Sequence, residues 1–265
     1  MIPQREIKEK ARVFGVPVST IERDYGQNWL LKNLSSINMA LKGGTGIRKV
    51  YIENYRFSDD LDFTLLEEIK VEEIKTKVKE AIVKSLEESG ISFDEDPVIS
   101  ENENGFAIDV YFRIMQRGPN KTRIKIDITK SFNEKIFLPL EEREIIHPYS
   151  DSFLSQVKVY SLEEILAEKI RSLFQRTRPR DLYDVWFLWK EWKKVDKTKV
   201  QQILPKKFKF KNVKLDINGL KSRKNNFKKA WKTSLGHQLK NLPAFEKVFN
   251  SVLKIIESTR IFRLS

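Results

Sequence analysis

The stretch "KGGTGIRKVYIENYRFSDDLDFTL", residues 42–65, holds the most informative pattern in this chain. It opens with a glycine pair and a threonine and closes with two aspartates separated by one residue. On a strand, Asp60 and Asp62 point to one face, whereas Leu61 and Phe63 point to the other and can pack in a core. Two carboxylates about 6–7 Å apart along a strand repel each other unless a cation lies between them. The stretch therefore predicts a strand whose polar face binds a cation.

A third aspartate has similar surroundings. The segment "RIKIDITK", residues 123–130, alternates isoleucines with polar residues, which places Asp127 on the polar face of a second strand. Oxygen ligands without nearby histidine or cysteine suit Mg²⁺ or Mn²⁺. On adjacent strands, Asp60, Asp62 and Asp127 can hold two ions about 3.5–4 Å apart, an arrangement that promotes displacement at phosphorus. We predict that these three aspartates are metal ligands and catalytic residues.

The glycine pair fits the same chemistry. Gly43 and Gly44 are expected to end a buried strand, and a helix is expected to begin near Thr45. Free backbone N–H groups at such a point bind phosphate, and the missing side chains let it approach closely. The pattern is neither a Walker A loop nor the Rossmann glycine pattern. Each motif alone also occurs in ordinary turns and solvated strands, but their order and spacing favour a single pocket.

The stretch resembles the first motif of the AbiEii/AbiGii toxin nucleotidyltransferases, a family that includes the MenT toxins and belongs to the polymerase-beta-like nucleotidyltransferase superfamily. The family pattern is a glycine pair with Ser/Thr, a spacer, and then Arg-x-Ser-x-Asp-x-Asp-Phe. The matching residues are Gly43, Gly44, Thr45, Arg56, Ser58, Asp60, Leu61, Asp62 and Phe63. Gly46 departs from the pattern, since alanine is more common there, but the change removes no functional atom. The resemblance implies that Gly43, Gly44, Thr45, Arg56 and Ser58 bind the nucleotide.

The segment "LEEILAEKIRSLFQRTRPRDLYDVW", residues 162–186, resembles the later motifs of the same family. The resemblance implies that Lys169 binds the triphosphate and that Asp181 is an active-site acid, with Asp184 and Arg180 beside them. The residues by themselves are also compatible with structural roles. Lys169 lies within the apolar stripe of its helix and could extend its amine past the core to water. The two aspartates could interact with a helix dipole, and Asp184 could pair with Arg180.

Periodicity predicts an α+β fold, in which a mixed nucleotidyltransferase sheet with flanking helices is followed by a C-terminal helical domain. The expected elements are helices over residues 3–14 and 70–89, from 162 and from 179, and strands within 37–44, 61–65, 106–115 and 123–130. Capping boxes are expected at Ser19 with Glu22 and at Ser161 with Glu164. A turn is expected between the last two strands, at residues 116–122.

Positive charge is concentrated in one segment. The net charge is +13, and residues 205–232 hold eleven Lys and Arg against one acid, Asp216. We place this segment in a helical domain, 159–265, after a nucleotidyltransferase-like domain, 1–158. Such a bias typically serves to bind polyphosphate, although a lysine-rich solvated face is the alternative. The predicted RNA-binding residues are Lys221, Arg223, Lys224, Lys228 and Lys229.

Composition excludes several classes of protein. The chain has 265 residues, 40% of them apolar, and no cysteine, which excludes disulfides and thiolate chemistry. It has no apolar run of about 18–20 residues and no signal-like N-terminus, so we expect a soluble cytoplasmic protein without a membrane contact. His147 and His237 stand in polar contexts without partners at ligand spacing, and no catalytic role is expected for them.

Together these features predict an enzyme that uses Mg²⁺ or Mn²⁺ to move an NMP from an NTP to an acceptor hydroxyl. The basic segment favours an RNA acceptor over a small molecule. The resemblance implies the 3′ end of tRNA as acceptor, a cognate antitoxin as partner, and the toxin role in a type IV toxin–antitoxin system. Two alternatives remain, a catalytically silent nucleotide- or nucleic-acid-binding protein on the same fold and an enzyme that nucleotidylates a protein.

Overall fold

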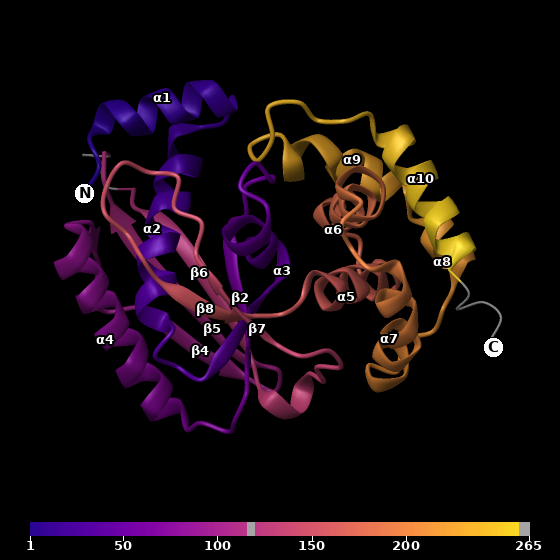
Figure 1. Ribbon diagram of the computed structural model, residues 1–265, viewed down its shortest axis with the longest axis horizontal. Coiled ribbons are helices and arrows are strands. Elements are labelled where there is room, and N and C mark those ends of the chain that lie inside the picture. Colours follow the sequence, from indigo (N-terminus) through magenta and orange to yellow (C-terminus); the bar gives the residue numbers. More distant parts are fainter. Residues whose placement is uncertain (116–119, 260–265) are drawn as a thin grey trace. The chain divides into compact units, whose positions relative to one another are not determined.

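A computed structural model describes residues 1–115 and 120–259 (Figure 1). The chain divides into two compact units. The first, here the sheet unit, comprises Met1–Glu134 and Leu140–Tyr160; the second, here the helical unit, comprises Lys135–Pro139 and the chain from Ser161 onward. The domain boundary that we expect between residues 158 and 159 stays a proposal.

The sheet unit is built on one mixed sheet. Its strands are β1 Met39–Lys42, β2 Asp60–Leu65, β3 Ser92–Phe93, β4 Val98–Asn102, β5 Gly105–Arg113, β6 Thr122–Thr129, β7 Glu141–Glu144 and β8 Gln156–Val159. Within the described residues the strand order is β3-β5-β6-β2-β1-β8-β7, and β4 also pairs with β5. Neighbours are antiparallel except for two parallel pairs, β2 with β6 and β1 with β8. The predicted mixed sheet is confirmed.

Alternation along the central strands gives the sheet one apolar and one polar face. Leu61 and Phe63 of β2 are buried, together with every second residue of β5 and β6. These side chains form one core with apolar residues of α1 (Gln4–Phe14), α2 (Val18–Leu34) and α4 (Val71–Ser89). Burying one large apolar side chain contributes about 1.5–3 kcal/mol, so this face fixes the register of the strands. The opposite face carries Asp60, Asp62 and Asp127.

Of the two predicted capping boxes, neither forms completely, and the first is absent. The capping box predicted at Ser19 and Glu22 is wrong, because α2 begins at Val18 after Pro17 and no side chain caps it. Glu22 is buried and instead accepts a hydrogen bond from the backbone N–H of Met115 at 2.8 Å. Burial raises the pKa of this carboxyl group, and the hydrogen bond opposes the rise. Glu22 is therefore used in tertiary packing and not in the helix cap that the local sequence pattern predicts.

Ser161 does cap its helix. Its hydroxyl accepts a hydrogen bond from the backbone N–H of Glu164 at 3.2 Å. Glu164 does not complete the capping box, because its carboxylate accepts hydrogen bonds from the backbone N–H groups of Phe137 and Leu138, each at 3.0 Å. This contact ties the segment Lys135–Pro139 to the helical unit.

The helical unit consists of helices and short connections. Its helices are α5 Leu162–Gln175, α6 Pro179–Trp186, the π-helix η3 Phe187–Trp192, α7 Lys197–Phe210, α8 Ile217–Ser222, α9 Lys224–Leu235 and α10 Phe245–Ser258. Lys207 of α7 is fully buried, with its Nζ 2.6 Å from Glu164 and 3.0 Å from Glu168 of α5. Removing one partner of such a buried pair costs about 3–5 kcal/mol, so it joins α7 firmly to α5.

The turn predicted at residues 116–122 falls largely on residues 116–119, which lie outside the described residues. Of the helices in the described part of the chain, none has both the length and the apolar character needed to cross a membrane.

Candidate active site

The glycine pair lies directly against the aspartates of β2. β1 ends at Lys42, and the short helix α3, Gly43–Gly46, begins at Gly43 rather than near Thr45. Gly43 has φ +72°, in the left-handed region that favours glycine. A Cβ atom at Gly43 would lie 2.5 Å from Oδ2 of Asp62, closer than real Cβ contacts allow. Only glycine leaves room for this carboxylate.

Gly44 has a different neighbour from the same quoted stretch. A Cβ atom there would lie 2.6 Å from Nη2 of Arg56 and 3.1 Å from Oγ of Ser58. Both of these side chains are buried. The fold therefore brings the glycine pair together with Asp62, Arg56 and Ser58, as the sequence predicts for one pocket.

Thr45 has a contact that the motif does not reveal. Its side chain is fully buried, and its hydroxyl donates a hydrogen bond to the backbone carbonyl of Asp60. The hydroxyl thus joins α3 to the first residue of β2. This contact positions Asp60, so the side chain of Thr45 acts through that aspartate.

The three aspartates lie on two adjacent strands. In the parallel pairing of β2 with β6, Asp62 is opposite Asp127, and on the other side of β2 Asp62 is opposite Lys42. Asp60 lies two residues along the same face, opposite Lys125. All three carboxylates are half-buried, and across residues 1–115 and 120–259 that of Asp62 has no hydrogen-bond or ion-pair partner.

The donor set fits a hard divalent cation, although the side chains do not yet converge. Carboxylate oxygens on one polar face are the ligands that Mg²⁺ and Mn²⁺ prefer. In the described part of the chain, no three His, Cys, Asp or Glu side chains are grouped closely enough to hold an ion. Asp127 is engaged elsewhere, because its Oδ2 lies 2.7 Å from Nζ of Lys125. Cation binding by all three carboxylates therefore requires Asp127 to leave this ion pair or share it.

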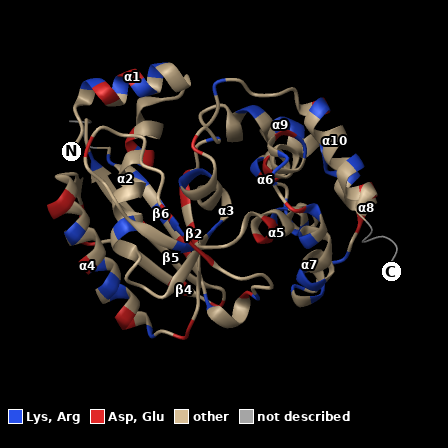
Figure 2. Ribbon diagram, viewed as in Figure 1, with Lys and Arg blue, Asp and Glu red and all other residues tan. Residues whose placement is uncertain are grey.

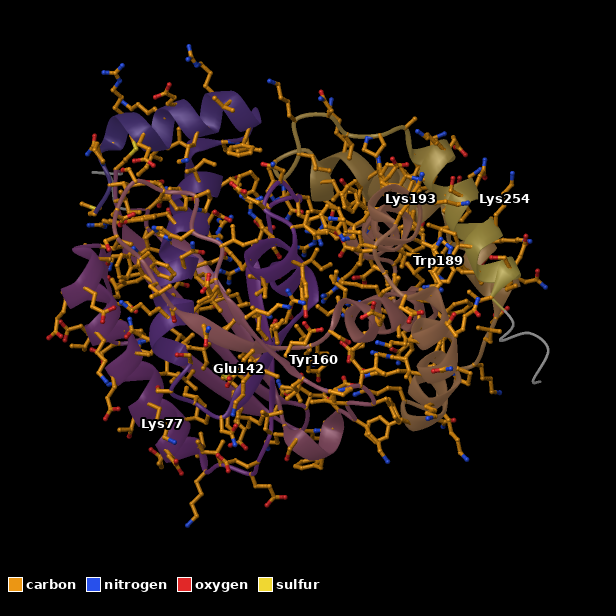
Figure 3. The ribbon with its side chains drawn as sticks, in the orientation of Figure 1. Lys77, Glu142, Tyr160, Trp189, Lys193 and Lys254 are labelled. Atoms are coloured by element: carbon orange, nitrogen blue, oxygen red, sulfur yellow. The ribbon has the colours of Figure 1, made fainter. Side chains whose placement is uncertain are left out.

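Lys42 extends across the polar face. Its Nζ donates a hydrogen bond to Oγ1 of Thr129 at 3.1 Å and lies 3.7 Å from Oε2 of Glu134. Because Lys42 is on β1 and Thr129 on β6, the side chain passes over β2, which lies between them. Next to this bridge Tyr160, labelled in Figure 3, donates a hydrogen bond to Oγ1 of Thr64 at 2.7 Å.

A buried ionic cluster supports the segment that follows the glycines. Asp24 of α2 accepts hydrogen bonds from Arg48 Nε at 2.7 Å and from the hydroxyl of Tyr149 at 2.7 Å, and Lys49 Nζ lies 2.8 Å away. Burial raises the pKa of Asp24, but the charges of Arg48 and Lys49 outweigh it and hold this pKa well below its usual value. Burial lowers the pKa of Lys49 to about 8, against the opposing effect of Asp24.

A second residue of α2 holds the start of β2. Gln27 donates hydrogen bonds from Nε2 to the backbone carbonyls of Ser58 and Asp59, at 3.0 and 3.1 Å. The side chain of Asp59 lies 2.9 Å from Nη1 of Arg23 and precedes the first residue of the strand. Asp59 is therefore occupied by α2, whereas its neighbour Asp60 belongs to the polar face of the sheet.

The later motif forms its own cluster within the helical unit. Lys169 Nζ lies 2.7 Å from Asp181 and 2.9 Å from Asp184, and all three side chains are largely buried. Arg176 Nε adds a hydrogen bond to Asp181 at 2.8 Å. Burial raises the pKa of Asp181, but Lys169 and Arg176 outweigh it and keep this pKa well below its usual value. The amine of Lys169 therefore pairs with two aspartates and does not extend past the core to water.

Part of the predicted RNA surface is paired within the chain. Lys221 lies 3.2 Å from Glu257, and Lys224 and Lys228 lie 2.6 and 3.0 Å from Glu246. Both glutamates belong to α10, which packs beside α9 (Figure 2). These three lysines are therefore partly neutralised before any ligand arrives.

The other two predicted residues differ from them. Arg223, the residue between α8 and α9, is half-buried and donates a hydrogen bond from Nη2 to the backbone carbonyl of Leu173 at 2.7 Å, so it joins this connection to α5. Lys229 is exposed and, in the described part of the chain, forms no ion pair.

The comparison of the sequence with known families agrees with this geometry. The profile of the family described as "Nucleotidyl transferase AbiEii toxin, Type IV TA system" matches residues 29–251. The chain belongs to the AbiEii family. It is thus a nucleotidyltransferase, of a toxin family from type IV toxin–antitoxin systems, which implies a nucleotide substrate and an antitoxin partner. The family that the sequence resembles is confirmed.

Solved structures show the same fold. MenT4, a nucleotidyltransferase toxin from Mycobacterium tuberculosis H37Rv, is 18% identical over 99% of this chain and 93% of its own, with a TM-score of 0.69. JHP933 from Helicobacter pylori is 19% identical over 94% of this chain and 96% of its own, with a TM-score of 0.59. No curated protein sequence matches the chain significantly. At these identities the likeness to the solved structures concerns the fold.

The AbiEii motif does not reveal every residue at this site. Lys42 directly precedes the glycine pair, and Lys125 shares the polar face with Asp127 two residues away. Their position in the sequence could have indicated both of them. The supporting role of Gln27 could not have been found in this way, because it depends on how α2 packs against the loop before β2.

Proposed function

We propose that this AbiEii-family enzyme uses Mg²⁺ or Mn²⁺ to transfer an NMP from an NTP to an acceptor hydroxyl, with release of pyrophosphate. One observation carries the proposal. The glycine pair is packed so closely against Asp62, Arg56 and Ser58 that any side chain on it would collide with them. Such a site places bare backbone, the guanidinium group of Arg56 and the carboxylate of Asp62 next to one another. Transfer from a nucleoside triphosphate needs these three kinds of group.

The nucleotide is held by the chain between β1 and β2. Gly43 and Gly44 offer backbone to the β- and γ-phosphates, and Arg56 and Ser58 supply a positive charge and a hydroxyl beside them. Thr45 assists by fixing the backbone of Asp60. Because the buried cluster around Asp24 holds the residues that follow, the phosphate-binding part of the site is formed before the nucleotide arrives, whereas Asp127 must still leave or share its ion pair with Lys125.

Asp60, Asp62 and Asp127 are the proposed ligands of the divalent cation. When bound, the cation stabilises charge on the transferred phosphoryl group and makes the acceptor hydroxyl easier to deprotonate. Asp127 serves as ligand or as base for the proton of that hydroxyl. Lys169 and Asp181 take part through the motif they share with the family, Lys169 by binding triphosphate charge and Asp181 by orienting the amine at 2.7 Å.

The proposed acceptor is RNA, and specifically the 3′ end of tRNA. The basic segment 205–232 supports this choice, since it can neutralise several phosphates. Within it, Lys221, Lys224 and Lys228 must exchange an acid of α10 for a phosphate, whereas Lys229 need not.

The experiment is an incorporation assay with each of the four α-labelled NTPs, total tRNA and Mg²⁺ or Mn²⁺. We expect label on the tRNA with at least one NTP, and none with tRNA whose terminal ribose has been oxidised by periodate. Asp60→Ala should lower the rate at least about 100-fold, because a cation ligand is lost. Absence of incorporation from all four NTPs by the wild-type protein would overturn the proposal.

The same assay separates the alternatives. A silent binding protein gives RNA binding with a steep salt dependence that Asp62→Ala leaves unchanged, without incorporation. An enzyme that modifies proteins transfers label to a polypeptide, and mass spectrometry of the protein and RNA after exposure to NTP distinguishes it.

A further inference from the structure

One lysine lies among the aspartates on the polar face of the sheet. Lys125 of β6 is opposite Asp60 of β2 on one side and opposite Asp109 of β5 on the other. Asp127 follows two residues later on the same face of β6. Lys125 thus has an aspartate on each neighbouring strand and one on its own strand.

Lys125 pairs with one member of this set. Its Nζ lies 2.7 Å from Oδ2 of Asp127. Asp109 is occupied by Arg123, at 3.2 Å, and Asp62 has no partner in the described part of the chain. Asp127, which is opposite Asp62, is therefore paired with a cation of the protein, Lys125.

The register of β2 and β6 explains why Asp127 needs a positively charged partner. Asp62 and Asp127 are opposite each other on strands about 5 Å apart. Like charges in directly opposed positions destabilise a sheet, and the ammonium group of Lys125 offsets part of that repulsion. The same ammonium group occupies an oxygen of Asp127 and repels a divalent cation that approaches this carboxylate. This repulsion is strong at short range.

We propose that Lys125 is an internal counter-ion that competes with the divalent cation for Asp127, and so sets how tightly the site binds that cation. The inference rests on the proposed role of Asp127 as a metal ligand. The side chain of Lys125 is 36% exposed, so its amine can move to water when a cation arrives. Lys125 acts on the reaction as a positioning residue, through Asp127.

Lys42 is the contrasting case on the same face. It is opposite Asp62, but its side chain is only 11% exposed, and its Nζ is held by Thr129 and Glu134. Leaving that position would break the hydrogen bond to Thr129 and the ion pair with Glu134, whose side chain is only 5% exposed. Lys42 therefore stays in place when the cation binds, and Lys125 is the one that yields.

The test is Mn²⁺ binding to the full-length chain, measured by isothermal titration calorimetry without nucleotide. Lys125→Met should lower the Kd for Mn²⁺ about tenfold, because both the competition and the repulsion are removed. Lys125→Gln should act in the same direction, and Lys125→Arg should not tighten binding. Lys121→Met is the matched control, since its side chain is also 36% exposed and pairs with Asp94 at 2.5 Å. It should leave the Kd within about twofold, as the loss of a distant exposed charge predicts.

A second readout does not depend on binding in the calorimeter. Without metal, Lys125→Met should have a lower Tm than the wild type, because Asp62 and Asp127 then repel each other, and Mn²⁺ should raise the Tm of the variant more than that of the wild type. An unchanged or weaker Mn²⁺ affinity in Lys125→Met overturns the inference and leaves the proposed function standing. An equal gain in Lys121→Met overturns it too, since net charge then accounts for the effect. Absence of binding by every variant overturns the metal role together with the inference.

Discussion

Single residues at this site are constrained by specific neighbours. Gly43 is required twice, by its φ of +72° and by the carboxylate of Asp62. Gly44 is constrained by the guanidinium end of Arg56 and by Oγ of Ser58, without the positive φ of Gly43. The two glycines are identical in the sequence motif, and the structure predicts different consequences for their loss.

An alanine at each glycine tests this difference. Gly43→Ala displaces Asp62 and adds backbone strain of about 1–2 kcal/mol, so kcat/KM for nucleotide transfer should fall at least about 100-fold. Gly44→Ala displaces Arg56 from the phosphates, and it should chiefly raise the KM for NTP, by about tenfold. Steady-state kinetics with varied NTP distinguish the two. Wild-type kinetics for Gly43→Ala would contradict this account of the pocket.

For single residues, the sequence predicts which side chains share a face wherever a local pattern repeats. The alternation in residues 123–130 shows which side chains share the face of Asp127, and the pairing of Asp62 with Asp127 follows once the two strands are adjacent. The bridge from Lys42 to Thr129 could not be predicted, because it depends on the strand order β6-β2-β1. Likewise, nothing local shows that Lys169 pairs with both Asp181 and Asp184.

At the scale of elements, α2 organises the segment between the glycines and the aspartates. Asp24 holds Arg48 and Lys49 of the π-helix η1, Ile47–Tyr51, and Gln27 holds the backbone just before β2. The failed capping box belongs to the same helix. The pattern at Ser19 and Glu22 is local, but burial of Glu22 against Met115 decided the outcome.

Lys49 gives this cluster a dependence on pH. Its pKa is about 8 in the folded protein and near 10.5 when unfolded. Between these values the unfolded chain binds more protons at Lys49 than the folded chain does, so the free energy of unfolding rises with pH. Relative to Lys49→Met, the wild type should therefore gain up to about 3 kcal/mol between pH 7.5 and 10. Urea unfolding at several pH values measures this difference, and a difference that stays constant with pH would count against the assignment.

At the scale of the whole molecule, composition predicted a basic segment but not its internal neutralisation. The acids that pair with Lys221, Lys224 and Lys228 lie on α10, outside residues 205–232. Such pairs cannot be predicted from the sequence, because their two members are far apart along the chain. The α+β architecture and its helical C-terminal part, in contrast, can be predicted from periodicity. The charge of this segment that is available to RNA is therefore smaller than the count of lysines indicates.

RNA binding by charge variants tests this point. Lys229→Gln should weaken tRNA binding and reduce the slope of log K against log salt by about 0.7–0.9, the value for one phosphate contact. Lys224→Gln should change the slope less, because Glu246 already pairs with that lysine. Filter binding or fluorescence anisotropy between low and moderate salt gives the slopes. Equal slopes for wild type and Lys229→Gln would remove Lys229 from the RNA surface.

The most direct test of the proposed chemistry compares two neighbouring aspartates in the labelled-NTP transfer assay. Asp62 lies against Gly43 on the polar face, whereas Asp59 pairs with Arg23 away from it. We expect Asp62→Asn to lower the rate of NMP transfer at least about 1,000-fold and Asp59→Asn to keep it within about threefold. Equal losses for the two variants, or full activity of Asp62→Asn, would contradict the proposed role of Asp62 as a cation ligand.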